Sequence, residues 1–240
     1  MRKYILESIP IDDYSLNTVA EKVISEKSNF QIFLNVHKIV MMKQYPKLFN
    51  SINEKDCIFS IDGMWVKWLA KNNTFSPKQR FGGLDVIEKF CQLSEKNNLK
   101  IYLLGSKPEV INIVITKLKE EYPKMNLCGY NDGYFKDEDQ MINKIISLDP
   151  DILFLALPSP RKELLGYKIY KKSHSIKYAA GVGGAFDVIA GFSPRAPSFI
   201  QNIGLEWLYR VLISPNKLFI RYFKDGISFL KILFIDFLKK

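Results

Sequence analysis

Short strand-like runs alternate with amphipathic helical stretches along most of this sequence, and this alternation strongly restricts the possible fold. Runs rich in β-branched, aromatic and other apolar residues occupy 31–36, 57–61, 100–105, 126–130, 151–157 and 177–183. Helix-period stretches such as VIEKFCQLSEKN and EVINIVITKLKEEY lie between them. Strands that alternate with helices at this spacing predict an α/β domain, with a mostly parallel, Rossmann-like sheet flanked by helices.

The pattern changes near residue 198. From there the sequence is helix-period, aromatic and basic, and no further strand-like run follows. We therefore expect two parts: an α/β domain over residues 1–197, and a helical, basic and amphipathic appendage over residues 198–240.

The charge and the cysteines narrow the class of protein. The formal net charge is +10, which indicates an anionic partner such as a nucleic acid, a phosphorylated substrate or a membrane surface. No recognised nucleic-acid-binding module accompanies the charge, so we expect no nucleic-acid partner. The three cysteines are widely spaced in apolar surroundings, as is typical of buried thiols in a reducing cytoplasm, and two histidines do not suggest a His-rich metal centre. The N-terminus lacks the apolar run of a secretory signal.

The strand-like runs end in polar residues. Ligands of parallel sheets bind beyond the carboxyl ends of the strands, so these residues are candidates for a site. Asp62 follows the run 57–61, where it is either the N-cap of the next helix or a general base. Asn35 and His37, at the end of the run 31–36, are typical of hydrogen-bonding loop residues rather than catalysts.

Other strand-like runs lead into turns rich in glycine or proline. Gly83 and Gly105 lie in turns that either hold a phosphate at a helix N-terminus or only connect two elements. In the segment LPSPRKE, Pro160 restricts the loop before Lys162 and Glu163 enter a helix. Such a loop either positions a carboxylate for sugar hydroxyls or is a stiff connection with surface charges.

The segment GVGGAFDVIAGFSPRAP, residues 181–197, is dense in glycine. It does not satisfy the dinucleotide motif G-x-G-x-x-G, because Phe186 stands at the position of the third glycine, and no strand with an acidic residue follows about twenty positions on. A nicotinamide-dependent oxidoreductase is therefore disfavoured. A glycine turn still allows a phosphate or a base to approach the backbone closely near Asp187.

Several of these motifs resemble, in the same order, those of the WecG/TagA/CpsF glycosyltransferases (glycosyltransferase family 26). They are DG after a strand, RFGGLD, LLGS, GYF, SPRKE, GVGGAFDVIAG, RAP and IGLEWLYR, over roughly residues 4 to 224. The resemblance implies an inverting hexosyltransferase that takes N-acetylmannosamine from a UDP-sugar, without a metal or other cofactor. The acceptor would be N-acetylglucosamine on undecaprenyl diphosphate, in bacterial teichoic acid, capsule or common-antigen synthesis. It also implies a peripheral protein on the cytoplasmic face of the membrane, which self-associates as a homo-oligomer.

The same resemblance assigns roles to individual residues. Asp62 would be the base that deprotonates the acceptor hydroxyl, and Arg210, with Lys217 or Arg221 of the appendage, would meet the charge on the leaving UDP. Arg195 either contacts the ligand or packs. The expected substrate-binding residues are Asn35, Arg80, Gly83, Asp85, Gly105, Ser106, Tyr134, Lys162, Glu163, Gly181, Gly183, Gly184, Asp187 and Arg195.

Two positions depart from the family's pattern. Phe33 stands where members often carry a threonine, and Lys162 replaces the glutamine of P-[KR]-Q-E, exchanging an amide that donates and accepts for a pure donor. Both changes leave the identity of the donor sugar open. The alternatives are transfer of a different UDP-hexose and a non-catalytic, membrane-associated protein that binds a UDP-sugar.

The last stretch, GISFLKILFIDFLKK, is the most hydrophobic part of the chain. It is shorter than the ~20 apolar residues that span a bilayer, and its apolar side chains form a stripe at helical spacing. This pattern predicts a helix that lies in the membrane interface, and the alternative is a helix docked on the protein's own core or on another subunit. Basic residues beside the stripe favour an anionic surface. The expected membrane-binding residues are Lys224, Ile227, Leu230, Lys231, Phe234 and Phe237.

Overall fold

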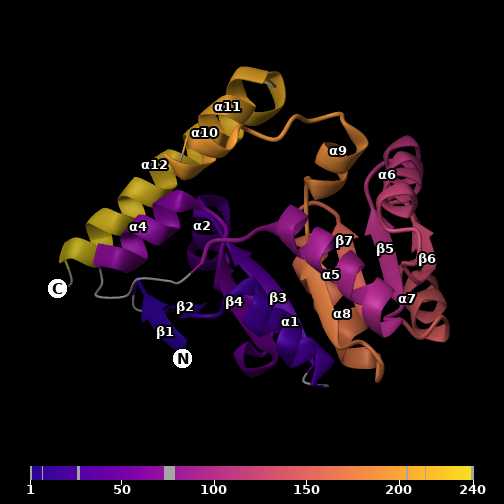
Figure 1. Cartoon of the computed structure of the whole chain (residues 1–240). Coiled ribbons are helices and arrows are strands. Elements are labelled where there is room, and N and C mark those ends of the chain that lie inside the picture. Colours follow the sequence, from indigo (N-terminus) through magenta and orange to yellow (C-terminus); the bar gives the residue numbers. More distant parts are fainter. Residues whose placement is uncertain are drawn as a thin grey trace.

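The computed structural model describes residues 2–6, 8–25, 28–72, 79–203, 205–213 and 215–238. A sheet lies in the middle of the molecule with helices on both faces (Figure 1). The elements in chain order are β1 (Arg2–Ile5), β2 (Ile9–Asp12), α1 (Leu16–Ile24), β3 (Asn29–Leu34), α2 (Val36–Gln44), α3 (Pro46–Phe49), the 3-10 helix η1 (Glu54–Asp56), β4 (Cys57–Ile61), α4 (Met64–Asn72), α5 (Gly83–Asn97), β5 (Ile101–Gly105), α6 (Pro108–Glu121), β6 (Leu127–Asn131), α7 (Glu138–Ser147), β7 (Ile152–Ala156), α8 (Arg161–Lys172), β8 (Tyr178–Gly181), α9 (Ala185–Ala190), α10 (Ser198–Asn202), α11 (Glu206–Ile213) and α12 (Pro215–Leu238).

The main sheet has six strands in the order β4-β3-β8-β7-β5-β6, and every neighbouring pair is parallel. Each strand falls on one of the predicted runs, so the expected α/β fold is confirmed. A separate antiparallel hairpin, β1 with β2, was not predicted. Its two strands have four residues each, too few to show a clear period-2 pattern.

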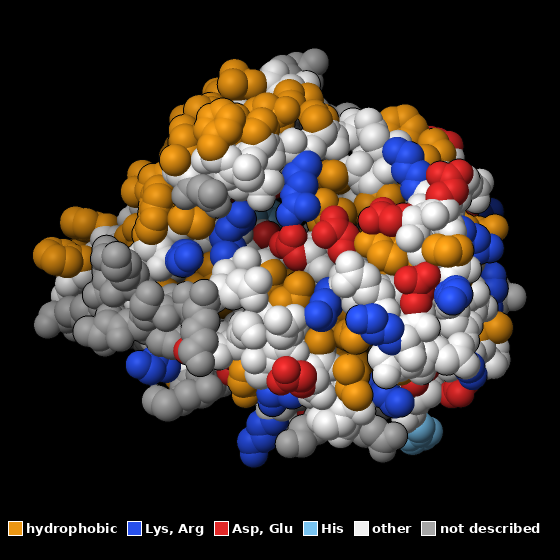
Figure 2. All heavy atoms as spheres, in the orientation of Figure 1, with side chains coloured by type: hydrophobic (Ala, Val, Ile, Leu, Met, Phe, Trp, Pro, Cys, Tyr) orange, Lys and Arg blue, Asp and Glu red, His pale blue; other side chains and the backbone are white. Residues whose placement is uncertain are grey.

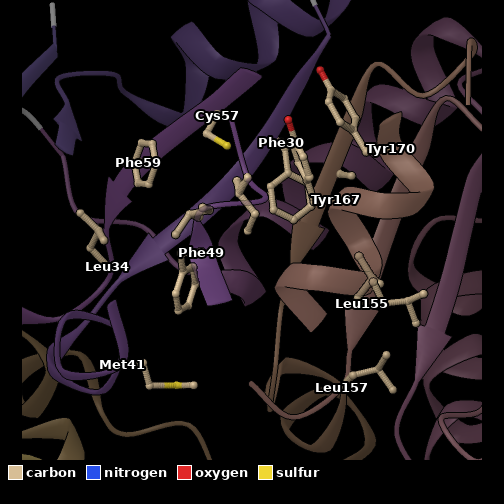
Figure 3. Close-up of a cluster of buried hydrophobic side chains, with 14 of the residues drawn as sticks. Phe30, Leu34, Met41, Phe49, Cys57, Phe59, Leu155, Leu157, Tyr167 and Tyr170 are labelled. Atoms are coloured by element: carbon tan, nitrogen blue, oxygen red, sulfur yellow. The ribbon is translucent and has the colours of Figure 1, made fainter. Parts of the chain in front are cut away.

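The core has two layers because side chains alternate between the faces of each strand. Along β3, Phe30, Ile32 and Leu34 enter a cluster that includes buried residues of α2, α7 and α8, whereas Phe33 enters a second cluster with α1, α5, α6 and α9. In the first cluster the ring of Phe30 packs against those of Tyr167 and Tyr170 (Figure 3), with centroids 5.5 and 6.0 Å away. The helices therefore cover both faces of the sheet.

Local chemistry sets several helix boundaries. Ser15 and Asp137 cap α1 and α7, since their side-chain oxygens accept hydrogen bonds from Thr18 N and Gln140 N. Pro108 occupies the first position of α6, where its missing N–H costs no hydrogen bond. Asn35 caps α2 by accepting from Lys38 N at 3.0 Å, which fixes Asn35 at the carboxyl end of β3.

The C-terminal part is helical, as expected, and its last helix α12 lies along α2 in the same layer of the core (Figure 1). Phe229 of α12 is buried in the first cluster, and Ile232 and Leu233 pack against that cluster. Asp225 is also buried, and its Oδ2 lies 2.8 Å from Nδ1 of His37. One face of α12 is therefore docked on the protein's own core, although the division of the chain at residue 197 stays a prediction.

Candidate active site

The order of the strands makes the carboxyl end of β8 the candidate place for a ligand. This strand lies between β3 and β7. The helices that follow its neighbours, α2 and α8, pack in one layer, whereas α9, which follows β8, packs in the other. Where consecutive helices leave a parallel sheet toward opposite faces, the crevice beyond the strand ends is the usual ligand site.

Asp62 lies directly after β4, next to the end of β3. Its backbone N–H donates to the carbonyl oxygen of Leu34 at 3.0 Å, and its carboxylate Oδ2 lies 3.4 Å from Nδ2 of Asn35. On the other side, a Cβ at Gly82 would lie only 2.5 Å from Oδ1 of Asp62. An asparagine amide and the closely approaching Gly82 therefore flank this half-buried carboxylate at the strand ends.

The N-cap interpretation of Asp62 does not hold for α4. This helix begins at Met64, and the carbonyl oxygen of Gly63 accepts from Lys67 N at 3.2 Å. Gly63 therefore occupies the N-cap position, one residue after Asp62. The alternative, a carboxylate held at the strand end for acid–base chemistry, fits the position better.

Arg80 connects this strand end to the C-terminal helices. Its guanidinium donates to the backbone carbonyl of Asp62 at 2.9 Å, lies 3.4 Å from Oε1 of Gln201 in α10, and pairs with Glu206 of α11 at 3.6 Å. A substrate contact by Arg80 stays a prediction. In the structure its bonds hold the backbone of Asp62 and tie α10 and α11 to the sheet.

The glycine turn after β8 is closely approached from two sides. A Cβ at Gly83 would lie 2.6 Å from the carbonyl oxygen of Val182, so the start of α5 touches the turn directly. From α8, methylene carbons of Lys162 lie 3.0 Å from the Cβ position of Gly181, and its Nζ lies 3.0 Å from that of Gly183. Gly183 also has φ +56°, which favours glycine. The ammonium group of Lys162 is thus held over the glycine turn.

A buried ion pair lies beside this turn. Nζ of Lys38, in the first turn of α2, pairs with Oε1 of Glu163 in the first turn of α8 and also donates to Oγ of Ser159 at 2.9 Å. Burial lowers the pKa of Lys38 from 10.5 to about 8, and the charge of Glu163 opposes that effect. Glu163 belongs to the predicted site residues, whereas Lys38 was missed. Its only signal in the sequence was a lysine at an apolar-facing position of NVHKIV.

The turn after β5 faces the start of α9. Gly105 has φ +124°, and a Cβ there would lie 2.5 Å from the carbonyl oxygen of Ala156 in the neighbouring strand. Oγ of Ser106 lies 3.5 Å from Oδ1 of Asp187, and the Ser106 carbonyl accepts from Gly133 N at 2.8 Å. Ser106 and Asp187 therefore meet beyond the strand ends, while the side chain of Tyr134, one residue after Gly133, is exposed.

Other predicted residues lie elsewhere. Asp85 caps α5 by accepting from Gly82 N at 2.8 Å and pairs with Arg195 at 2.6 Å, along the open hollow beside α5. Arg195 thus packs against α5 in this structure. The guanidinium of Arg221 lies over the ring of Tyr222, 5.1 Å from its centroid. The side chains of Arg210 and Lys217 lie outside the described residues.

The contacts described so far define one site, which we call the strand-end site. Within the described part of the chain, no three His, Cys, Asp or Glu side chains are grouped so as to hold a metal ion. Both positive charges of the site are lysine ammonium groups. Its members are Asn35, Lys38, Asp62, Gly82, Gly83, Lys162, Glu163 and residues 181–183.

Comparison with known proteins decides the family. The model of the Glycosyl transferase WecG/TagA/CpsF family matches residues 4–240. The chain belongs to this family. Two curated relatives are each named N-acetylglucosaminyldiphosphoundecaprenol N-acetyl-beta-D-mannosaminyltransferase. The one from Bacillus subtilis is 34% identical over 157 residues, which are 64% of this chain and 60% of that relative. The one from Bacillus spizizenii is 32% identical over 174 residues, which are 72% of this chain and 67% of that relative.

Phe33, one departure from the pattern expected of a WecG/TagA/CpsF protein, does not face the strand-end site. Its side chain is buried in the second core cluster, with its ring packed edge-on against Phe81 at 6.3 Å. Packing thus explains an aromatic residue at this position. Phe33 has no hydroxyl group that could bind a ligand as a threonine could. Lys162, the other departure, lies within the site.

The C-terminal helices of this WecG/TagA/CpsF chain carry an exposed apolar surface (Figure 2). Leu230 and Phe237 of α12 are 66% and 75% exposed, and Lys224 and Lys231 are exposed beside them. None of the described helices has both the length and the apolar character needed to cross a bilayer. We call the exposed apolar side chains of α12 the outer face: Phe219, Ile220, Phe223, Ile227, Leu230, Phe234, Ile235, Phe237 and Leu238.

Proposed function

We propose that this chain is an inverting glycosyltransferase that moves N-acetylmannosamine from a UDP-sugar to N-acetylglucosamine on a polyprenyl diphosphate, in the synthesis of a cell-surface polysaccharide. Membership of the family supports transfer, and the names of the two relatives support the acceptor and the sugar. The observation that carries the proposal is the carboxylate of Asp62, held at the strand ends between Asn35 and Gly82.

In this mechanism Asp62 accepts the proton of the acceptor hydroxyl. The hydroxyl oxygen forms a bond to the anomeric carbon while the bond from that carbon to the diphosphate oxygen breaks, and its electron pair leaves with UDP. A single in-line displacement of this kind inverts the anomeric configuration and needs one base. Asn35 orients the base through its Nδ2 contact with Oδ2.

The leaving UDP gains negative charge, which a fixed cation stabilises best. Lys162 is suited to that role because its ammonium group lies over the glycine turn at Gly183, where backbone permits close approach of a diphosphate. Arg210, Lys217 and Arg221 of the C-terminal helices are proposed as further cations. Turnover of an Arg210→Ala variant that matches the wild type at saturating substrate would remove Arg210 from this group. We expect turnover to persist in the presence of a chelator, because no step needs a metal.

The lipid-linked acceptor places the reaction at a membrane. We propose that the outer face of α12 enters the interface of an anionic leaflet on the cytoplasmic side, as a peripheral contact. Exposed Lys224 and Lys231 lie beside this face, and each basic residue near such a surface contributes about 1 kcal/mol. A homo-oligomer, which the family's self-association implies, remains part of the proposal.

A second candidate is transfer of a different UDP-hexose. Phe33 is buried where the family often has a threonine hydroxyl, and Lys162 stands in place of a glutamine at the glycine turn. Lys162 lies where the donor would be held, whereas Phe33 faces the core, so the lysine in place of a glutamine favours a test of several sugars rather than one.

The proposal is tested by UDP release from the purified protein with a short-chain lipid diphosphate that carries N-acetylglucosamine. A panel of UDP-sugars is assayed with and without acceptor, and with and without chelator. The expected result is acceptor-dependent release with UDP-N-acetylmannosamine. Release with another sugar alone would support the second candidate. Binding of every sugar without turnover would support a UDP-sugar-binding protein and contradict the proposal.

A further inference from the structure

Glu163 carries a polar atom that the proposed mechanism does not use. Its side chain is 5% exposed, and its oxygen Oε1 is engaged by Lys38 and by Oγ of Ser159 at 3.1 Å. Its other oxygen, Oε2, is buried and has no hydrogen-bond partner among the described residues. A buried carboxylate oxygen without a protein partner costs free energy, which a hydrogen bond from a water molecule or from a ligand would recover.

The ion pair of Glu163 with Lys38 joins two helices across the end of β8. Lys38 is in the first turn of α2, which follows β3, and Glu163 is in the first turn of α8, which follows β7. Because β8 lies between these two strands, the pair bridges the base of the glycine turn. The pair is therefore within the strand-end site and is not a remote structural contact.

The neighbours of Oε2 restrict what the donor can be. An ionised carboxylate only accepts hydrogen bonds, so its partner must be an O–H or N–H group and not a phosphate oxygen. The adjacent cation, Nζ of Lys162, lies 3.8 Å from Oε1. A cation and a carboxylate this close suit a ligand in which a diphosphate adjoins hydroxyl and amide donors. The sugar end of a nucleotide sugar has this arrangement.

We propose that Glu163 selects the transferred sugar by accepting a hydrogen bond at Oε2 from one of its hydroxyl or amide groups, and that Lys38 is the positioning residue that holds Glu163 for this contact. The inference rests on the proposed function and adds a determinant of the donor sugar. Lys38 fixes Oε1 from the side of α2, which leaves Oε2 as the oxygen that can accept a hydrogen bond from a ligand.

The test compares the binding of UDP with that of UDP-N-acetylmannosamine and UDP-N-acetylglucosamine by titration calorimetry. In Glu163→Gln the single amide oxygen remains for Lys38, and a donor NH₂ group faces the sugar. We expect this variant to bind the preferred UDP-sugar about 10- to 100-fold more weakly, the effect of losing a hydrogen bond to a charged group, while its affinity for UDP stays within about twofold. Lys38→Met should show the same pattern, with weaker binding of the UDP-sugar and nearly unchanged binding of UDP.

Two further variants control for folding. Lys168→Met removes an exposed lysine of the same helix, which pairs with Asp139, and should change neither affinity. Lys38→Arg keeps the cation and should retain more of the sugar's contribution to binding than Lys38→Met does. It takes the place of Lys38→Met in the test if that variant does not fold. Loss of UDP and UDP-sugar affinity in equal measure, or no loss in Glu163→Gln, would overturn the inference. A wild-type protein that binds no UDP compound would instead contradict the proposed function.

Discussion

The helices around the sheet and the helix α12 have similar apolar patterns but different surroundings. In α5, Val86, Ile87 and Phe90 are fully buried between the helix and the sheet. Among the apolar side chains of α12 that the structure describes, only Phe229 is buried, at 6% exposed, while Phe234 and Phe237 on another side of the helix are exposed. α12 therefore carries more apolar area than one docked face covers. An amphipathic pattern thus predicts that a face will be covered, but not what covers it.

The two regions also differ in whether their charged side chains are buried or exposed. The strand-end site buries Lys38 and Glu163 and pairs them, whereas Lys224 and Lys231 of α12 remain exposed. Salt screens exposed charges strongly and buried pairs weakly. The electrostatics of the strand-end site should therefore act over a short range and be insensitive to salt, while those of α12 should depend on ionic strength.

The largest effect on stability should come from breaking the buried pair. Lys38→Met leaves the buried Glu163 with only the more distant Lys162 as a cation, at 3.8 Å, and should lower the free energy of unfolding by about 3 kcal/mol, whereas Lys38→Met/Glu163→Met should be close to neutral. Lys224→Met, on the exposed side of α12, should change it by less than about 0.5 kcal/mol. Urea unfolding measures all three. A double variant as unstable as the single one would contradict this account of the pair.

The next largest effects should distinguish the buried side of α12 from its exposed side. Phe229→Ala empties a buried position and should cost about 3 kcal/mol of stability. Phe234→Ala should leave stability within about 0.5 kcal/mol but weaken binding to anionic vesicles by about tenfold, because that side chain would lose its insertion into the interface. Thermal melts and vesicle sedimentation measure the two effects. Equal vesicle binding by wild type and Phe234→Ala would argue that the outer face meets another protein surface.

Stability should rise with pH where Lys38 loses its proton. Burial holds the pKa of Lys38 at about 8, below its ordinary value of 10.5, so between these values the unfolded chain binds more protons than the folded one. Glu163 and Lys162 are the charged groups that act on it. Relative to Lys38→Met/Glu163→Met, the wild type should gain about 2 kcal/mol between about pH 7.5 and 9.5. A constant difference across this range would show that Lys38 keeps its ordinary pKa.

The smallest effect should come from the exposed lysines. Each of Lys224→Gln and Lys231→Gln should weaken binding to anionic vesicles by about 1 kcal/mol, or roughly fivefold, because each removes one charge near the surface. Added salt should reduce the difference. Neutral vesicles provide the control, since wild type and variants should bind them equally. An unchanged affinity for anionic vesicles would place both lysines away from the membrane.

Much of this architecture was predictable from local patterns. The six central strands are short runs in which apolar residues predominate, so they and the residues after them, such as Asp62, were found directly. Long-range contacts were not. Lys38 was missed because its partner Glu163 lies in another helix, and the sequence left open whether the last helix docks on the core, as Leu233 does. Which residues are buried depends on which helices and strands pack together, and the local spacing of apolar residues does not determine that.

The central claim is that Asp62 is the base of a transfer reaction at the strand ends, and one measurement tests it most directly. Turnover of Asp62→Asn is compared with wild type at saturating UDP-sugar and lipid acceptor, and the affinity of both proteins for UDP is measured alongside. The account predicts a fall in turnover of about 10²–10⁴-fold, the usual contribution of a general base, with UDP affinity unchanged. Turnover within about threefold of wild type would contradict the assignment of Asp62 as that base.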